Sequence, residues 1–292
     1  MCGHCGCGEE AATTVLNLQT GKQTVMERVR DSRDHVDEDG HDHPHSHGHE
    51  DGHSHEHGHD HAHADGVRHR HFVELETRIL AKNDAFAEKN RAWFRGREIL
   101  ALNLMSSPGA GKTTLLERTI RELSRDIRLF VVEGDQATDN DGKRIRAAGA
   151  AAVQVNTGSG CHLEADMVAR GLQELRPTPG SVVMIENVGN LVCPALFDLG
   201  EQAKVIILSV AEGDDKPLKY PHMFRAAQMM ILSKMDLAPH VDFDPERAVA
   251  NALRVNPSIS TIRLSARTGE GLDRWYDWLR GELARVHDQA FA

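Results

Sequence analysis

The chain has 292 residues and a formal net charge of −10, a length that suits one large or two small domains. Its longest apolar run near the expected sheet core, 205–208, is far shorter than the roughly 20 residues that cross a bilayer. The N-terminus lacks the basic flank and apolar core of a signal peptide. We therefore expect a cytoplasmic protein without a membrane partner, whose five cysteines are thiolate ligands or reduced thiols.

The negative charge is concentrated in one segment. Residues 31–65 hold eleven acidic residues and one arginine, and the remaining 33 acids and 33 bases cancel. The rest of the chain therefore has no basic bias, which argues against nucleic acid as a partner.

Residues 1–34 begin with three closely spaced thiols, those of Cys2, Cys5 and Cys7. Thiols at this spacing can converge on one soft or borderline metal ion, with His4 or the terminal amine as a fourth ligand. The alternative is a reactive terminus that binds no metal. We predict no firm structure for residues 9–34.

Residues 35–71 contain fourteen of the nineteen histidines. Such a tract cannot bury a core, so we expect disorder without ligand. Neutral imidazole binds Ni²⁺, Cu²⁺ and Zn²⁺, which favours loose binding of several ions over a purely solubilising tail. The candidate ligands are His41, His43, His45, His47, His49, His53, His55, His57, His59, His61 and His63.

From Phe72 an apolar stripe at helical spacing predicts a packing helix within residues 72–98, ending near Gly96. Residues 99–292 then alternate strand and helix patterns, which indicates a mostly parallel sheet with helices on both faces. We predict strands at 99–105, 128–132, 152–155, 182–185, 205–210, 229–232 and 261–264. We predict helices at 113–124, 140–149, 162–175, 217–227, 245–254 and 271–284.

The segment 106–114 reads Ser-Ser-Pro-Gly-Ala-Gly-Lys-Thr-Thr and lies between the first of these strands and the first of these helices. That context is typical of a phosphate-binding P-loop, although the usual first glycine is Ser106. The alternative is a glycine-rich turn with a chance Gly-Lys-Thr. We expect Lys112 to reach the β- and γ-phosphates and Thr113 to hold Mg²⁺. The other expected nucleotide-binding residues of the loop are Gly109, Ala110, Gly111 and Thr114.

Carboxylates follow two of the expected strands. Asp135, with Glu133, follows the second, and Glu186 follows the fourth, just before Gly189. Because ligands bind at the carboxyl ends of parallel strands, we expect Asp135 and Glu186 to hold Mg²⁺ and to act with Lys112 and Thr113 in catalysis. Each carboxylate alone can equally be a helix cap or a surface residue.

Two later strand ends resemble the guanine-recognition motifs of GTPases. Lys234 and Asp236 belong to Ser-Lys-Met-Asp, and Ser265 and Ala266 begin Ser-Ala-Arg. An aspartate accepts two hydrogen bonds from guanine, and adenine would leave it unpaired. Ser233 replaces the usual asparagine and puts one supporting hydrogen bond in doubt.

A second group of metal-binding residue types falls at strand ends. Cys161 and His162 follow the third strand, and Cys193 follows the fourth. One parallel sheet can bring these three ligands together. Separate buried cysteines and a helix-capping histidine are an equally weighted alternative.

With these motifs the chain resembles the HypB family of hydrogenase nickel-incorporation GTPases. The resemblance rests on the N-terminal cysteines, the histidine tract and the segments 79–84, 106–114, 156–163, 186–194 and 212–221. It implies a P-loop NTPase three-layer α/β fold in residues 99–292, preceded by a disordered metal-binding N-terminal region.

The resemblance also implies a function: a low-turnover GTPase that uses Mg²⁺, forms a nucleotide-dependent homodimer and passes Ni²⁺ toward [NiFe]-hydrogenase, with nickel stored by the histidine tract. It implies Ni²⁺ or Zn²⁺ at Cys161, His162 and Cys193. The implied partners are a HypA-type nickel/zinc accessory protein and the hydrogenase large-subunit precursor.

Three alternatives stay open. A metal-storage protein would explain the histidines but not the guanine motifs. A urease-maturation GTPase can also carry a histidine tract, but we would not expect the cysteine-rich start. An unrelated P-loop kinase is disfavoured by Asp236 and by Ser265-Ala266.

Overall fold

The structure, a computed structural model, describes residues 13–25, 62–135, 140–158 and 160–290, with the backbone alone for 62–76, 140 and 290. The described residues fall into two units. The larger holds residues 13–25 and the chain from Leu80 onward, and the smaller holds the part of the first helix that ends at Ile79. The fold and the sites below belong to the larger unit.

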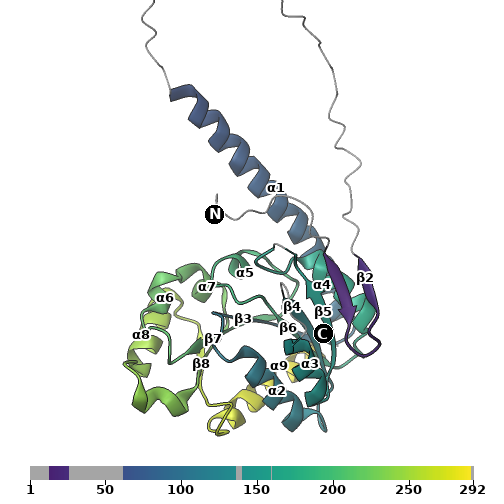
Figure 1. Ribbon diagram of the computed structural model, residues 1–292, viewed down its shortest axis with the longest axis vertical. Helices are drawn as coiled ribbons and strands as arrows, with labels where there is room; N and C mark the ends of the chain where they lie inside the picture. The colour runs from purple at the N-terminus through teal and green to yellow at the C-terminus, as the bar shows by residue number, and fades with distance from the viewer. Residues whose placement is uncertain (1–12, 26–61, 136–139, 159, 291–292) are drawn as a thin grey trace, which may run out of the picture. The chain divides into compact units, whose positions relative to one another are not determined.

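Within the described residues, one nine-stranded sheet has the order β2-β1-β5-β4-β6-β3-β7-β8-β9 (Figure 1). The seven strands from β3 to β9 are parallel, and β1 and β2 are antiparallel to their neighbours. The bounds are β1 (Thr14–Asn17), β2 (Gln23–Val25), β3 (Leu100–Ser106), β4 (Leu129–Asp135), β5 (Ala151–Asn156), β6 (Val182–Glu186), β7 (Ala203–Ser209), β8 (Met229–Ser233) and β9 (Ser260–Arg263).

The seven predicted strands correspond to β3 through β9, which confirms the mostly parallel α/β sheet. The main difference is the end of β4, which continues to Asp135 rather than stopping at residue 132. Glu133 and Gly134 pair with Gln154 and Val155 of β5. Polar or small side chains are common in loops, so the sequence pattern ended the strand early. The hydrogen-bonded pairing with β5 extends it.

The hairpin β1–β2 lies in a segment for which the sequence predicted no structure. Its strands are short, but β1 pairs antiparallel with β5, from Thr14 opposite Asn156 to Asn17 opposite Val153. Val15 is buried. The hairpin is therefore stabilised by the edge of the sheet rather than by its own propensity, which two short strands cannot supply alone.

The helices are α1 (Ala62–Arg95), α2 (Lys112–Leu123), α3 (Asn140–Ala148), α4 (Ala165–Leu175), α5 (Cys193–Leu196), α6 (Lys216–Lys219), α7 (Pro221–Ala226), α8 (Pro245–Val255) and α9 (Leu272–Ala290), with a 3₁₀-helix at Met235–His240. The single helix predicted at 217–227 is wrong. It divides into α6 and α7 because Pro221 has no N–H for a continuing helical hydrogen bond. The sequence did not predict α5 or the 3₁₀-helix.

The start of α1 also differs from the prediction. The helix begins at Ala62 rather than at Phe72. The last part of the segment that we assigned to an unstructured histidine tract, residues 62–71, is therefore helical. Alanine and arginine in this stretch favour helix. The helix ends at Arg95, next to Gly96, as predicted.

Alternate residues along the strands enter two separate apolar layers. On one face, Leu102 and Leu104 of β3 pack with residues of α2, α3 and α9, including Trp275. On the other face, Ala101 and Phe94 join a cluster formed with α4, and Met105 joins one formed with α7 and α8. This three-layer arrangement exposes the carboxyl ends of the parallel strands, where the candidate site residues lie.

Candidate functional site

The loop from Ser107 to Gly111 joins β3 directly to α2. Gly109 has φ 74° and Gly111 has φ 99°, both in the left-handed region that side-chain-bearing residues rarely adopt. Lys112 and Thr113 then occupy the first turn of α2. A helix start preceded by such a turn directs backbone N–H groups toward a bound anion.

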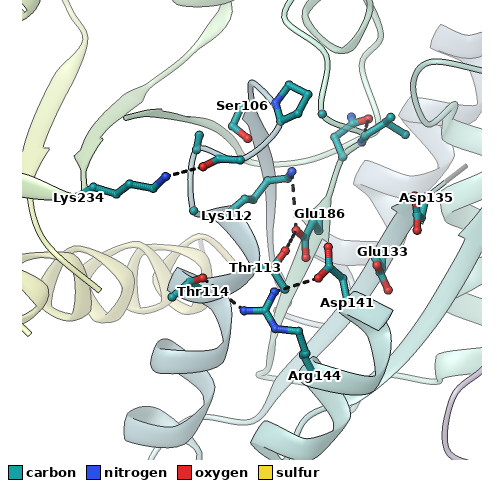
Figure 2. Close-up of a pocket in the computed structure, with 18 residues that line it drawn as sticks. Ser106, Lys112, Thr113, Thr114, Glu133, Asp135, Asp141, Arg144, Glu186 and Lys234 are labelled. Atoms are coloured by element: carbon teal, nitrogen blue, oxygen red, sulfur yellow. Dashed lines mark hydrogen bonds and ion pairs between the residues drawn. The ribbon is translucent and has the colours of Figure 1, made fainter. Parts of the chain in front are cut away.

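A cavity of about 490 Å³ opens over this loop, and we call it the P-loop cavity (Figure 2). The cavity is lined by Pro108 to Gly111 of the loop and by Lys112, Thr113, Asp135, Glu186 and Gly189. The structure thus brings together, from three separate segments of chain, the residues that the sequence assigned to phosphate and Mg²⁺. Their chemical roles stay predictions.

Glu186 is the centre of this cavity's hydrogen bonding. Thr113 Oγ1 donates a 2.7 Å hydrogen bond to Glu186 Oε1, and Lys112 Nζ lies 3.7 Å from the same oxygen (Figure 2). Burial raises the pKa of Glu186, and the charge of Lys112 opposes that rise. A hydroxyl and a carboxylate oxygen in contact are the kinds of atom that a hard divalent cation takes as ligands.

Glu133 adds a second buried carboxyl group. Burial, followed by repulsion from Glu186, Asp135 and Asp141, raises the pKa of Glu133 to about 9. Among the described residues, Glu133 Oε2 and Glu186 Oε2 have no hydrogen-bond partner. Oxygen atoms left unpaired in a buried acidic cavity fit a Mg²⁺ ion, which would offset the repulsion.

Sequence reasoning missed Arg144, a cation that also lines the P-loop cavity. It lies on α3 and contacts Asp141 at 3.0 Å, Glu117 at 2.9 Å and the Thr114 hydroxyl at 3.4 Å. The spacing of Asp141 and Arg144 on a predicted helix was visible in the sequence. Nothing local, however, showed that α3 packs against α2 at the mouth of the cavity.

A second cavity, of about 250 Å³, adjoins the first and shares Gly111, Thr114 and Lys234 with it. We call it the Asp236 cavity, since Asp236, Ser265 and Ala266 line it. The hydroxyl of Ser265 donates to Asp236 Oδ1 at 2.6 Å. That bond orients the carboxylate, so the expected guanine-recognition residues converge on one volume beside the loop.

Two residues of the Ser-Lys-Met-Asp segment contact the loop itself. Lys234 Nζ donates to the carbonyl of Gly109 at 2.7 Å, as Figure 2 shows. Ser233 Oγ donates to the carbonyl of Ala110 at 2.7 Å. The serine that stands in place of the usual asparagine therefore makes a hydrogen bond between the base-side segment and the phosphate-side loop.

Cys161, His162 and Cys193 lie together, with one potential ligand atom from each within 4.8 Å of the others. The two sulfur atoms are 3.1 Å apart as free thiols, and Cys161 Sγ is 3.7 Å from His162 Nδ1. Burial lowers the pKa of His162 to about 4, which keeps the ring neutral at pH 7. Two thiols and a neutral imidazole fit a borderline metal ion such as Ni²⁺ or Zn²⁺.

Residues that the sequence did not single out hold this cluster in shape. The Phe197 ring lies against the His162 ring, with centroids 3.9 Å apart. Lys204 donates to the carbonyls of Ala195 and Phe197 at 3.2 and 3.0 Å, at the end of α5. Since α5 begins at Cys193, these contacts fix the segment that carries the second thiol.

The other predicted metal ligands cannot be placed. Cys2, Cys5, Cys7 and the histidines from His41 to His61 lie outside the described residues, and only the backbone is described at His63. Among the residues that the structure describes, we find no helix with the length and apolarity that a bilayer crossing requires.

The three-layer sheet and the loop between β3 and α2 define a P-loop NTPase fold. Residues 100–263 match the family described as CobW/HypB/UreG, nucleotide-binding domain. The hydrogenase maturation factor HypB of Rhizobium leguminosarum bv. viciae is 57% identical over 213 residues, which cover 73% of this chain and 71% of that protein. HypB of Escherichia coli K12 is 55% identical over 210 residues, 72% of each.

Solved structures agree. HypB from Archaeoglobus fulgidus has a TM-score of 0.66 at 40% identity, over 70% of this chain and all of that one. HypB from Helicobacter pylori, in complex with nickel, has a TM-score of 0.66 at 36% identity, over 70% of this chain and 96% of that one. The chain belongs to the HypB family of hydrogenase maturation factors.

Proposed function

We propose that this protein is a GTP-hydrolysing nickel metallochaperone that assists nickel insertion into [NiFe]-hydrogenase. The observation that carries the proposal is the junction of two cavities at Gly111, Thr114 and Lys234. The P-loop cavity suits a triphosphate with Mg²⁺, and the Asp236 cavity suits a base. One nucleotide can therefore occupy both.

Asp236 supports guanine as the base. Its carboxylate, oriented by Ser265, can accept hydrogen bonds from guanine N1–H and the exocyclic amine, a donor pair that adenine lacks. The backbone N–H of Ala266 can meet the guanine oxygen. The proposed nucleotides are GTP and GDP.

Hydrolysis of GTP is the addition of water to the γ-phosphorus with cleavage of its bond to the β–γ bridging oxygen, which yields GDP and phosphate. Lys112 would stabilise charge on the phosphoryl oxygens. Thr113, Asp135 and Glu186 would hold Mg²⁺, which neutralises phosphate charge. The acids near Glu186 make this cavity unfavourable for a bare triphosphate, so we expect the reaction to need the ion. The resemblance to the HypB GTPases implies that turnover is low.

Nickel is the proposed cargo of the Cys161–His162–Cys193 cluster, with Zn²⁺ as a second metal that the same ligands accept. The Helicobacter pylori relative is described in complex with nickel. The three N-terminal cysteines and the histidine tract would add further sites, the tract as a store. We propose the same cytoplasmic setting, nucleotide-dependent homodimer, HypA-type accessory protein and hydrogenase large-subunit precursor that the sequence suggested.

The test measures phosphate release from GTP and from ATP with Mg²⁺. Ni²⁺ binding is followed by thiolate-to-nickel absorption in a chain with Cys2→Ser, Cys5→Ser and Cys7→Ser, which reports the inner cluster even though the histidine tract also binds nickel. We expect slow turnover of GTP, little turnover of ATP and Ni²⁺ binding that weakens in Cys161→Ser and Cys193→Ser. Equal turnover of both nucleotides would refute guanine selection, and unchanged Ni²⁺ binding in both variants would refute the inner metal site.

A further inference from the structure

Leu163 joins the two candidate sites. It directly follows His162 in the chain, and its side chain is fully buried. That side chain lies over Gly134: a Cβ added at Gly134 would be 2.7 Å from Leu163 Cγ and 2.9 Å from Cδ1. No side chain larger than hydrogen fits there without displacing the leucine. Gly134 lines the P-loop cavity between Glu133 and Asp135.

The backbone of Leu163 is held from a second direction. Its N–H donates to Asn187 Oδ1 at 3.2 Å. Asn187 is buried, follows Glu186 directly and lines the P-loop cavity. The same oxygen accepts from the N–H of Val188 at 3.0 Å. The side-chain oxygen of Asn187 therefore holds both the segment that carries Cys161 and His162 and the segment that leads from Glu186 to Cys193.

Asn187 is itself anchored to the sheet. Its Nδ2 donates to Asn103 Oδ1 of β3 at 3.3 Å, and its backbone N–H donates to the carbonyl of Leu104 at 3.1 Å. Asn103 in turn donates to Glu201 at 3.1 Å. A buried polar chain of this kind has few alternative arrangements, since each broken bond leaves an unpaired group.

We propose that Leu163 and Asn187 are the positioning residues through which the P-loop cavity and the Cys161–His162–Cys193 cluster act on each other. The inference rests on the proposed function and adds the physical link between its two sites. A change at the end of β4 or β6 moves the surface on which Leu163 rests or the atom that holds its N–H. His162 moves with Leu163 because the two share a peptide bond.

Coupling of this kind is reciprocal for binding affinities. A nucleotide that draws Glu186 and Asp135 inward changes the position of His162 relative to Cys193, and with it the affinity for metal. Metal bound by His162 must change nucleotide affinity by the same factor. Leu163 touches neither ligand in this scheme, so its removal should reduce the coupling more than either affinity.

The experiment uses the full chain with Cys2→Ser, Cys5→Ser and Cys7→Ser, which leaves Cys161 and Cys193 as the remaining thiols of five. Thiolate-to-nickel absorption then reports the inner cluster even though the histidine tract is present. Ni²⁺ is titrated in Mg²⁺ with GDP and with a non-hydrolysable GTP analogue. The ratio of the two dissociation constants measures the coupling, for which about 5–150-fold is the usual range.

Leu163→Ala should bring this ratio below about 2, whereas Leu163→Met, which nearly conserves volume, should keep it. Leu172→Ala is the matched control, since Leu172 is buried in the same apolar cluster as Leu163 but lies within α4, which begins after Leu163. It should also keep the ratio. If Leu163→Ala does not fold, Leu163→Val should give an intermediate ratio.

An undiminished ratio in folded Leu163→Ala would overturn the inference and leave the segment from Glu186 to Cys193 as the link. A ratio of one in the parent chain would also overturn it, without affecting the proposed function. That function fails separately, if the parent chain hydrolyses no GTP or shows no thiolate-bound nickel.

Discussion

The hydroxyl of Ser233 donates a 2.7 Å hydrogen bond to the carbonyl of Ala110. Ser233 ends β8, and Ala110 lies in the loop after β3, so the bond ties the base-side segment to the phosphate-side loop. Both residues are buried. Ser233 is the position at which this chain departs from the usual Asn-Lys-x-Asp motif. Its shorter side chain has one donor, and that donor is hydrogen-bonded to the loop.

Ser233→Ala should weaken GDP and GTP binding about fivefold, because a lost hydrogen bond of this kind contributes about 1 kcal/mol. Fluorescence titration with a labelled GDP measures the change. Ser260→Ala, at an exposed position on β9, is the control and should have no effect. An unaltered dissociation constant for Ser233→Ala would show that the bond to Ala110 does not shape the nucleotide site.

Asp236→Asn should weaken GTP binding by at least about tenfold and shift the preference toward xanthine nucleotides, because the amide donates where the carboxylate accepts. Competition between GTP and XTP for the labelled site measures the preference. Ser265→Ala is an informative companion, since it removes the 2.6 Å bond that orients Asp236 but not the carboxylate. It should weaken binding without changing which base is preferred. Retained GTP preference in Asp236→Asn would contradict the guanine assignment.

Thr113→Ala and Lys112→Ala should each reduce GTP hydrolysis by about 100-fold or more. The first removes a proposed Mg²⁺ ligand, and the second removes the positive charge that would stabilise the phosphoryl oxygens. Phosphate release under saturating nucleotide measures the loss. Nickel bound by residues 1–61 should be unchanged in both variants, since those residues are separate in sequence from the P-loop. Loss of that nickel from a folded Lys112→Ala protein would contradict the modular organisation.

The sequence predicted the elements whose patterns are local. The strands β3 to β9, the P-loop and the residues at the strand ends were all readable from period and motif, since each buried strand is a short apolar run followed by polar residues. The meeting of Cys161, His162 and Cys193 was one of two equal alternatives, because spacing alone does not say which strand ends are neighbours.

What the sequence did not predict depends on tertiary contacts. The hairpin β1–β2 forms because β5 offers an unpaired edge, and a short polar segment carries no sign of that edge. Arg144 reaches the P-loop cavity because α3 packs on α2. Asn187 follows the predicted fourth strand, and nothing in the sequence singled it out, yet it is buried and its Oδ1 accepts the N–H of Leu163. Such roles belong to pairs of distant residues.

In the absence of nucleotide and metal, Glu133→Gln should raise the free energy of unfolding at any pH above about 5. The pKa of Glu133 is raised from 4.5 to about 9, so the folded state holds a proton that the unfolded state releases between these values. The stability that this group contributes is therefore complete below pH 4.5 and is lost as the pH rises toward 9. Glutamine resembles the protonated acid and does not titrate.

The measurement is urea unfolding of wild type and Glu133→Gln from pH 5 to pH 9. We expect the difference in free energy of unfolding to grow with pH and to reach about 2–4 kcal/mol near pH 7.5. Glu246→Gln, at an exposed position, is the control. A difference that does not vary with pH would mean that Glu133 is ionised in the folded protein.

Deletion of residues 35–61 should remove most of the loosely bound Ni²⁺ and leave GTP turnover unchanged. This deletion ends before α1, which begins at Ala62, so the helix and the attachment of its part from Leu80 onward to the rest of the larger unit are retained. That attachment includes Asn90, whose Nδ2 donates to the carbonyls of Ala165 and Leu199 at 2.7 and 3.0 Å. A deletion carried to residue 71 would shorten the helix and confuse loss of ligands with loss of structure.

Equilibrium dialysis should show fewer bound ions, and hydrogenase maturation in cells should fail only when nickel is scarce. Maturation that fails even in excess nickel would mean that the histidine tract takes part in delivery as well as storage.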